Sequence, residues 1–125
     1  MDRREVGAAA ERAVAQWFEQ RGFVVIARNV RLQRGELDMI VRGRGTLWFV
    51  ESKCRTRADV GPPHRAVDRR KVAALWAAAR EYLYRTRHTG SFGFLVASVI
   101  WDPRGASPII AVVRWPFSPP NRCRR

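Results

Sequence analysis

The chain has 125 residues, 46% of them hydrophobic, which suits one globular domain and is too short for two good cores. Its 24 basic and 11 acidic residues give a net charge of +13, which favours polyanionic partners such as DNA, RNA or an anionic membrane surface. A GC-rich genome that favours arginine codons is the competing explanation for the excess. No apolar run reaches the roughly 18 to 20 residues of a membrane span, and the first residues lack the apolar core of a signal peptide. We therefore expect a cytoplasmic protein with no membrane-embedded part.

The spacing of apolar residues predicts seven elements in chain order. They are a helix over 6–20, strands over 23–31, 36–41 and 47–53, a helix over 67–84, and strands over 92–101 and 109–115. The second helix connects the third and fourth strands as a crossover, so those two strands should be parallel. The sequence predicts a single α/β domain over residues 1–115, with a mixed five-stranded sheet flanked by helices in the order αβββαββ. The basic, proline-rich segment 116–125 is expected to be a loosely ordered tail.

Ionisable residues interrupt two of the apolar strands. Asp38 is followed by Met-Ile-Val, and Glu51 is preceded by Leu-Trp-Phe-Val. Lys53 follows two residues after Glu51, and it is one of only two lysines among the 24 basic residues. Charges placed within a half-buried sheet need a partner, so these residues are candidates for a functional site.

Hairpin symmetry predicts how these charges pair. If the turn is centred on Arg44–Gly45, paired residues sum to 89, which sets Asp38 opposite Glu51 and Glu36 opposite Lys53. Residues two apart in a strand share a face, so all four side chains should cluster. In that arrangement Glu36 would support the site from beside Lys53.

Two facing carboxylates repel each other unless one is protonated or a cation lies between them. Mg²⁺ or Mn²⁺ suits such oxygen ligands, and Lys53 could then stabilise charge on a phosphate or act as a general base. The alternative is a structural salt bridge between Lys53 and Glu51 or Glu36. Glu11 lies at the edge of the apolar stripe of the first helix, where it could lean into the site or remain a solvated helical glutamate.

Several short motifs together resemble a known family. They are Gly7 with Glu11 and Trp17-Phe18, Gly22-Phe23, Arg28-Asn29, Gly35-Glu36-Leu37-Asp38, Phe49-Val50-Glu51-Ser52-Lys53-Cys54-Arg55, Lys71 and Phe92-Gly93-Phe94. This arrangement is similar to the PD-(D/E)XK nuclease superfamily and its Holliday junction resolvase branch. It resembles most closely the YraN family of small bacterial endonuclease-like proteins.

The resemblance implies a restriction endonuclease-like fold and a Mg²⁺- or Mn²⁺-dependent endonuclease that hydrolyses phosphodiester bonds in DNA, with branched structures as candidate substrates. It implies that Asp38 and Glu51 bind the metal, that Lys53 is catalytic and that Glu11 supports the metal site. Related resolvases work as dimers, so a homodimer is expected. A catalytically weak or inactive nucleic-acid-binding protein with the same fold is the alternative.

Three positions depart from the resemblance. Ser52 replaces a valine, and Leu37 stands where the superfamily name has proline, although an apolar residue is usual there in the closer family. Gly93 replaces an aspartate that usually follows phenylalanine in the late strand. If that aspartate orients active-site groups, its loss would weaken activity, whereas a structural aspartate would matter little.

Basic residues cluster after the Glu51 motif and at the hairpin tip, where they could contact phosphates or form a solvated charged face. The candidates for nucleic-acid binding are Arg42, Arg44, Arg55, Arg57, Arg65, Arg69, Arg70 and Lys71.

Overall fold

The computed structural model describes residues 3–55, 69–101 and 108–115. The elements are α1 (Arg3–Gln20), β1 (Val24–Leu32), β2 (Gly35–Gly43), β3 (Thr46–Arg55), α2 (Arg69–Arg85), β4 (Ser91–Ile100) and β5 (Ile109–Arg114). The predicted order αβββαββ is confirmed. The largest change of a boundary is at the start of α1, which begins at Arg3 instead of residue 6. The tail at 116–125 lies outside the described residues.

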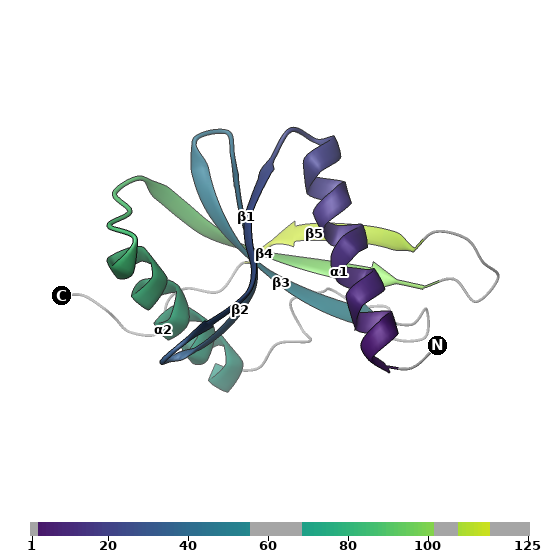
Figure 1. The fold of residues 1–125 in the computed structure, drawn as a ribbon, viewed down its shortest axis with the longest axis horizontal. Helices are drawn as coiled ribbons and strands as arrows, with labels where there is room; N and C mark the ends of the chain where they lie inside the picture. Colours follow the sequence, from purple (N-terminus) through teal and green to yellow (C-terminus); the bar gives the residue numbers. More distant parts are fainter. Residues whose placement is uncertain (1–2, 56–68, 102–107, 116–125) are drawn as a thin grey trace.

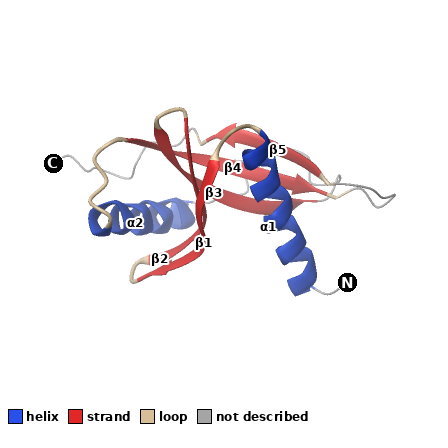
Figure 2. Ribbon diagram, turned by 45° about the horizontal axis from the view of Figure 1, so that its top comes forward, coloured by secondary structure: helices blue, strands red, loops and turns tan. Residues whose placement is uncertain are grey.

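The five strands form one mixed sheet in the order β1-β2-β3-β4-β5. β3 and β4 are parallel, and the other neighbouring pairs are antiparallel. The prediction that the crossover through α2 makes β3 and β4 parallel is therefore confirmed. The two helices lie on opposite sides of the sheet (Figures 1 and 2). Neither helix in the described ranges combines the length and apolar character that crossing a bilayer requires.

Each helix covers its own hydrophobic core. On α1, Val14 and Phe18 are fully buried and pack against the sheet residues Met39 and Val41. Their spacing of four places them on one helical face. The core under α2 contains Val72, Leu75, Ala78 and Ala79 from the helix, and Leu37, Ile40, Leu47, Phe49, Phe94 and Val96 from the sheet.

The turn between β2 and β3 sets the register of the site. Arg44 and Gly45 both have positive φ angles, 55° and 77°, as the two central residues of a tight type I′ hairpin turn do. The pairs run from Gly43↔Thr46 to Met39↔Val50, and each pair sums to 89. The predicted symmetry of the hairpin is confirmed over this stretch, which ends one residue before Asp38.

Strand alternation breaks at Asp38. Leu37 and Ile40 belong to the core under α2, whereas Met39 belongs to the core under α1. The neighbouring strand changes at the same level, where Asn29 has a φ angle of 53°, a left-handed conformation that asparagine tolerates better than most residues. β1 and β2 therefore both bend at this level. Along β2, Leu37 and Met39 are two residues apart but no longer share a face.

Candidate functional site

The pairing of β2 and β3 ends where Asp38 and Glu51 begin. The last backbone pair of the β2–β3 ladder is Met39 with Val50, so the ladder stops before Asp38. Instead, the Oδ2 atom of Asp38 accepts a hydrogen bond of 3.0 Å from the backbone N–H of Ser52. This bond fixes the Asp38 carboxylate beside the preceding residue of β3, Glu51. The two acids that the sequence placed opposite each other are thus neighbours.

Glu51 is a buried acid in an unfavourable electrostatic position. Its side chain is only 5% exposed, and a small cavity beside it is lined by the apolar residues Leu37, Phe49 and Leu75. Burial, followed by the negative charge of Asp38, raises the pKa of Glu51 from 4.5 to about 7. A hydrogen bond between the two carboxyl side chains acts in the same direction. The site therefore favours either a proton or a cation at Glu51.

Both lysines of the chain lie at Glu51. Lys71 Nζ is 2.9 Å from Glu51 Oε2, whereas Lys53 Nζ is 3.9 Å from the same oxygen. The short contact is a charge-assisted hydrogen bond, and the long one is a weaker Coulombic contact. The hydrogen bond to Glu51 raises the pKa of Lys71 above its ordinary value, so Lys71 stays protonated. The salt bridge expected as the alternative use of Glu51 is made chiefly by Lys71.

Lys71 was expected on a phosphate-binding rim, and its place beside Glu51 was not predicted. It lies in the first turn of α2, which the crossover brings over the end of β3. The sequence contained one signal for it, because Lys71 is the only lysine besides Lys53 in a chain with 22 arginines.

Glu36 does not join this cluster. Its carboxylate contacts Arg31 Nε at 2.9 Å, and its side chain is 61% exposed. Arg31 faces Glu36 across the β1–β2 ladder. The predicted pairing of Glu36 with Lys53 is wrong, because it assumed regular alternation through Asp38, where the strand bends.

Glu11 approaches the site through an intermediary. Its Oε1 atom accepts a hydrogen bond of 3.0 Å from Asn29 Nδ2. The β1–β2 register on either side of Asn29 sets this residue level with Asp38. The structure thus connects Glu11, through Asn29, to the bend that carries Asp38. In the described ranges, no group of three or more acids, histidines or cysteines is placed to hold a metal ion.

The donor atoms at the site fit a hard divalent cation. Asp38 and Glu51 supply oxygen ligands from two adjacent carboxylates, and such a pair is commonly how proteins hold Mg²⁺ together with waters or phosphate. The raised pKa of Glu51 is what two acids without an intervening metal should show. Ser98, which pairs with Lys53 in the sheet, adds a buried hydroxyl without a hydrogen-bond partner among the described residues.

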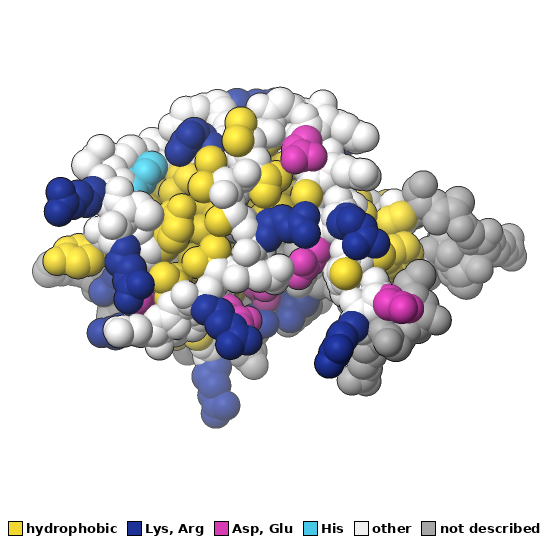
Figure 3. Space-filling view, viewed as in Figure 1, with side chains coloured by type: hydrophobic (Ala, Val, Ile, Leu, Met, Phe, Trp, Pro, Cys, Tyr) yellow, Lys and Arg dark blue, Asp and Glu magenta, His cyan; other side chains and the backbone are white. Residues whose placement is uncertain are grey.

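The remaining basic candidates are spread over the molecule. Arg70 is exposed in the first turn of α2, next to Lys71. Arg44 lies six residues from Asp38 along β2 and its turn, roughly 20 Å in an extended strand, and its guanidinium lies 5.6 Å from the ring centre of Phe23. The hairpin tip with Arg42 and Arg44 is therefore remote from the acids. Arg57 and Arg65 lie outside the described residues, whereas Arg55 ends β3 and Arg69 begins α2. On the face seen in Figure 3, Lys and Arg side chains are spread across the surface among scattered acids.

Gly93 lies on the other face of the sheet from Glu51. A Cβ atom at Gly93 would lie 2.6 Å from the ring of Trp48, which packs against the core under α1. Gly93 pairs with Trp48, whereas Glu51 pairs with Val96 further along β4. The glycine at this position therefore accommodates the indole of Trp48 and is not part of the acid cluster.

The site residues Glu11, Asp38, Glu51, Lys53 and Lys71 all fall within one region of family similarity. The sequence model described as "Uncharacterised protein family UPF0102" matches residues 10–100. This chain belongs to the UPF0102 family. The resemblance to the YraN family is thereby confirmed.

Relatives in this family extend over most of the chain. A UPF0102 protein of Clavibacter michiganensis is 34% identical over 116 residues, which cover 88% of this chain and 93% of that protein. A UPF0102 protein of Dictyoglomus turgidum is 30% identical over 120 residues, covering 95% and 98% of the two chains. A third, from Symbiobacterium thermophilum, is 43% identical over 82 residues, covering 66% and 70%. The names of these relatives state no activity.

Proposed function

We propose that this protein is a divalent-metal-dependent endonuclease that hydrolyses phosphodiester bonds in DNA. The observation that carries the proposal is the proximity of the half-buried Asp38 carboxyl to the buried Glu51 carboxyl, where the pairing of β2 and β3 ends, with two lysines beside Glu51. A pair of acids that repel each other costs stability. The presence of this pair inside the sheet, where the β2–β3 ladder ends, is accounted for if the two acids bind a cation during function.

The two acids have distinct supporting contacts. The N–H of Ser52 holds Asp38 in place, so this carboxylate is oriented before any ligand binds. Glu51 is held by Lys71. We propose that both acids bind Mg²⁺ or Mn²⁺, which would polarise a phosphate oxygen and promote deprotonation of the attacking water.

Lys53 is the proposed catalytic lysine. Its side chain is 27% exposed, and its ammonium lies 3.9 Å from Glu51, at the limit of ion-pair distance. Lys53 is therefore less firmly held by Glu51 than Lys71 is. From this position it can stabilise the negative charge that develops on the phosphate. Glu11, which is tied to Asn29 at the bend, is proposed to support the orientation of Asp38.

The substrate class follows from charge and from the resemblance. A net charge of +13 favours binding to a phosphate backbone, with an affinity that falls steeply with salt. No base-reading motif is visible in the sequence, so recognition should depend on the backbone and on DNA shape. The resemblance to Holliday junction resolvases makes four-way junctions the first substrate to test, and a homodimer the first assembly to test.

The decisive experiment compares cleavage of four-way, nicked and linear DNA with Mn²⁺, with Mg²⁺ and with EDTA. Wild-type protein should cut at least one substrate only with metal. Asp38→Ala and Lys53→Ala should each reduce the rate by at least about 100-fold, the scale for loss of a group that acts in the transition state.

Arg4→Ala is the matched control. It removes one positive charge from the exposed start of α1, at a residue that has no role in the proposed site, and should leave the rate nearly unchanged. Cleavage that persists in EDTA, or in both site variants prepared in parallel, would show that the activity belongs elsewhere and would refute the proposal.

A non-catalytic DNA-binding protein is the second candidate, and one observation favours it. Lys71 already supplies a positive charge at 2.9 Å from Glu51, as an internal cation would in a site that no longer binds metal. Lys71→Met separates the two functions, because removal of a competing ammonium should increase Mn²⁺ affinity in an active site. DNA binding without cleavage in wild type and in Lys71→Met would support the second candidate.

A further inference from the structure

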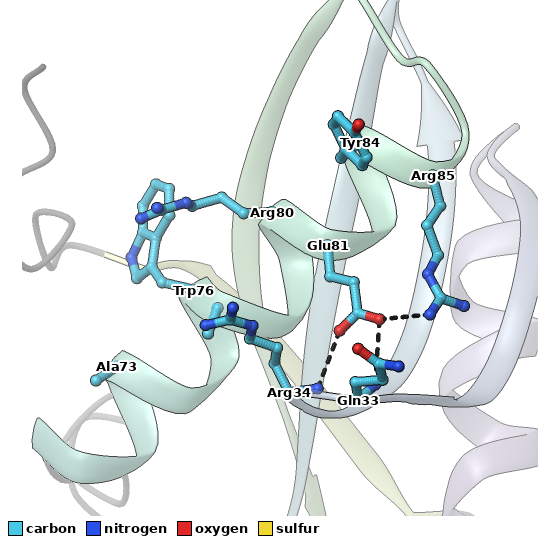
Figure 4. Close-up of a pocket in the computed structure, with 9 residues that line it drawn as sticks. Gln33, Arg34, Ala73, Trp76, Arg80, Glu81, Tyr84 and Arg85 are labelled. Atoms are coloured by element: carbon cyan, nitrogen blue, oxygen red, sulfur yellow. Dashed lines mark hydrogen bonds and ion pairs between the residues drawn. The ribbon is translucent and has the colours of Figure 1, made fainter.

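An open groove on the outer side of α2 is not used by the proposed reaction. It has a volume of about 630 Å³ and is formed by α2 and the turn between β1 and β2. In Figure 4, Arg34 enters from the turn, whereas Trp76, Arg80, Tyr84 and Arg85 come from the helix. Trp76, Arg80 and Tyr84 recur at a spacing of four, so they lie on one face of the helix.

The groove is braced from inside by Glu81. One carboxylate oxygen accepts the backbone N–H of Arg34 at 2.9 Å, and the other accepts the backbone N–H of Gln33 at 3.2 Å. The second oxygen also contacts Arg85 at 3.0 Å. Burial opposes ionisation of Glu81, but these bonds outweigh it and lower its pKa. The acid is therefore engaged in fixing the turn against α2.

Two arginines and one aromatic ring remain available to a ligand. Within the described residues, neither Arg34 nor Arg80 forms an ion pair with a carboxylate. Tyr84 is 85% exposed, the highest exposure among the large hydrophobic side chains described. Trp76 lies deeper, against Phe94 at a ring-centre distance of 4.6 Å, and gives the groove a rigid aromatic wall.

We propose that this groove binds unpaired nucleotides, with a base stacked on Tyr84 and phosphates held by Arg34 and Arg80. Proteins bind single-stranded nucleic acid through this combination of an electropositive track and aromatic platforms, without reading sequence. An anionic ligand fits the charges, and a planar ring fits the exposed face of Tyr84. An acidic peptide would match the charges alone.

The position of the groove relates it to the acid site. Lys71 and Tyr84 are thirteen residues apart on α2, or roughly 20 Å along the helix axis. Both therefore lie on the α2 side of the sheet, the first at the start of the helix and the second near its end. If the acid site cleaves DNA, as proposed above, the groove would hold an unpaired strand that extends from the cleaved position.

Binding is tested in EDTA, so that the result does not depend on cleavage. Anisotropy of a short fluorescein-labelled oligothymidylate is measured with wild type, Tyr84→Ala, Tyr84→Phe, Arg80→Ala and Arg4→Ala. Tyr84→Ala should weaken binding by about 5- to 100-fold, the range for loss of one base–aromatic stack, whereas Tyr84→Phe should bind like wild type. Arg80→Ala should reduce the slope of log affinity against log salt by about 0.7, and Arg4→Ala should change it less.

The outcomes separate this inference from the proposed nuclease. Equal binding by Tyr84→Ala and wild type would overturn the proposal that the groove binds nucleotides, and it would leave the proposal of metal-dependent cleavage unaffected. Loss of binding in Tyr84→Ala, together with no cleavage by wild type, would support nucleotide binding in the groove and refute the proposed nuclease activity. Oligoglutamate has no bases to stack. If Tyr84→Ala weakens its binding as much as it weakens binding of the oligothymidylate, the stacking role of Tyr84 is overturned. A Tyr84→Ala effect that follows a change of oligomeric state in sedimentation would also overturn the proposal.

Discussion

Replacing Glu51 by glutamine should remove a specific pH dependence of stability. Glu51 has a pKa of about 7 in the folded protein, against an ordinary value of 4.5. The folded state thus binds this proton more tightly than the unfolded state does. The stabilisation is fully present below pH 4.5 and is lost as the pH rises through about 7.

The expected size of this effect follows from the shift. A difference of about 2.5 units, at 1.36 kcal/mol per unit, corresponds to about 3 kcal/mol of unfolding free energy. Most of this loss falls between pH 5 and pH 8. The group is only 5% exposed, so solvent screening reduces the figure less than it would at the surface.

Urea unfolding in EDTA at a series of pH values measures the effect. The free energy of unfolding of wild type should fall relative to that of Glu51→Gln as the pH rises, and the difference between the two proteins cancels the contributions of other titrating groups. Mn²⁺ added at pH 8 should restore part of the stability of wild type, because a bound cation replaces the proton. Parallel curves for the two proteins would show that Glu51 is already ionised at low pH and would contradict the electrostatic description of the site.

Three further substitutions test other parts of the structure. Gly93→Asp should lower the free energy of unfolding by about 1 to 3 kcal/mol through its clash with Trp48, while the metal-dependent cleavage rate of the folded fraction stays unchanged; a normal stability in urea would contradict this packing. Asn29→Ala should be less stable than Asn29→Gly by about 1 kcal/mol, because the φ angle of 53° is strained for alanine, and equal urea midpoints would count against the bend. Arg31→Ala should cost less than about 1 kcal/mol, since its pair with Glu36 is solvent-exposed, and a larger loss by thermal unfolding would show that this pair supports the hairpin.

Much of the fold could be predicted because its signals are local. The apolar spacing of Val14 and Phe18 gives the face of α1, and the Arg44–Gly45 turn gives the register of the β2–β3 hairpin. A two-residue turn leaves one antiparallel pairing. The proximity of Asp38 to Glu51 could be predicted by extending that pairing, although the ladder itself ends one pair earlier, at Met39 and Val50.

The errors arise where local pattern and tertiary structure differ. Glu36 was placed beside Lys53 by strict alternation, but the bend at Asp38 and Asn29 directs it to Arg31. The position of Lys71 depends on how α2 docks over the sheet, which the sequence of the helix alone does not specify. The groove at Tyr84 likewise requires two segments far apart in the chain to meet.

The use of lysine at the acid site has a physical explanation. The chain has 22 arginines and two lysines, and both lysines contact Glu51. An arginine there would hold a carboxylate in a planar, bidentate contact and would remain charged at any accessible pH. A lysine makes a single contact from a flexible stem, so it can leave the carboxylate when a divalent cation or a phosphate arrives. The choice of lysine thus fits a site whose ion pair must open, and it argues against Lys71–Glu51 as a purely structural salt bridge.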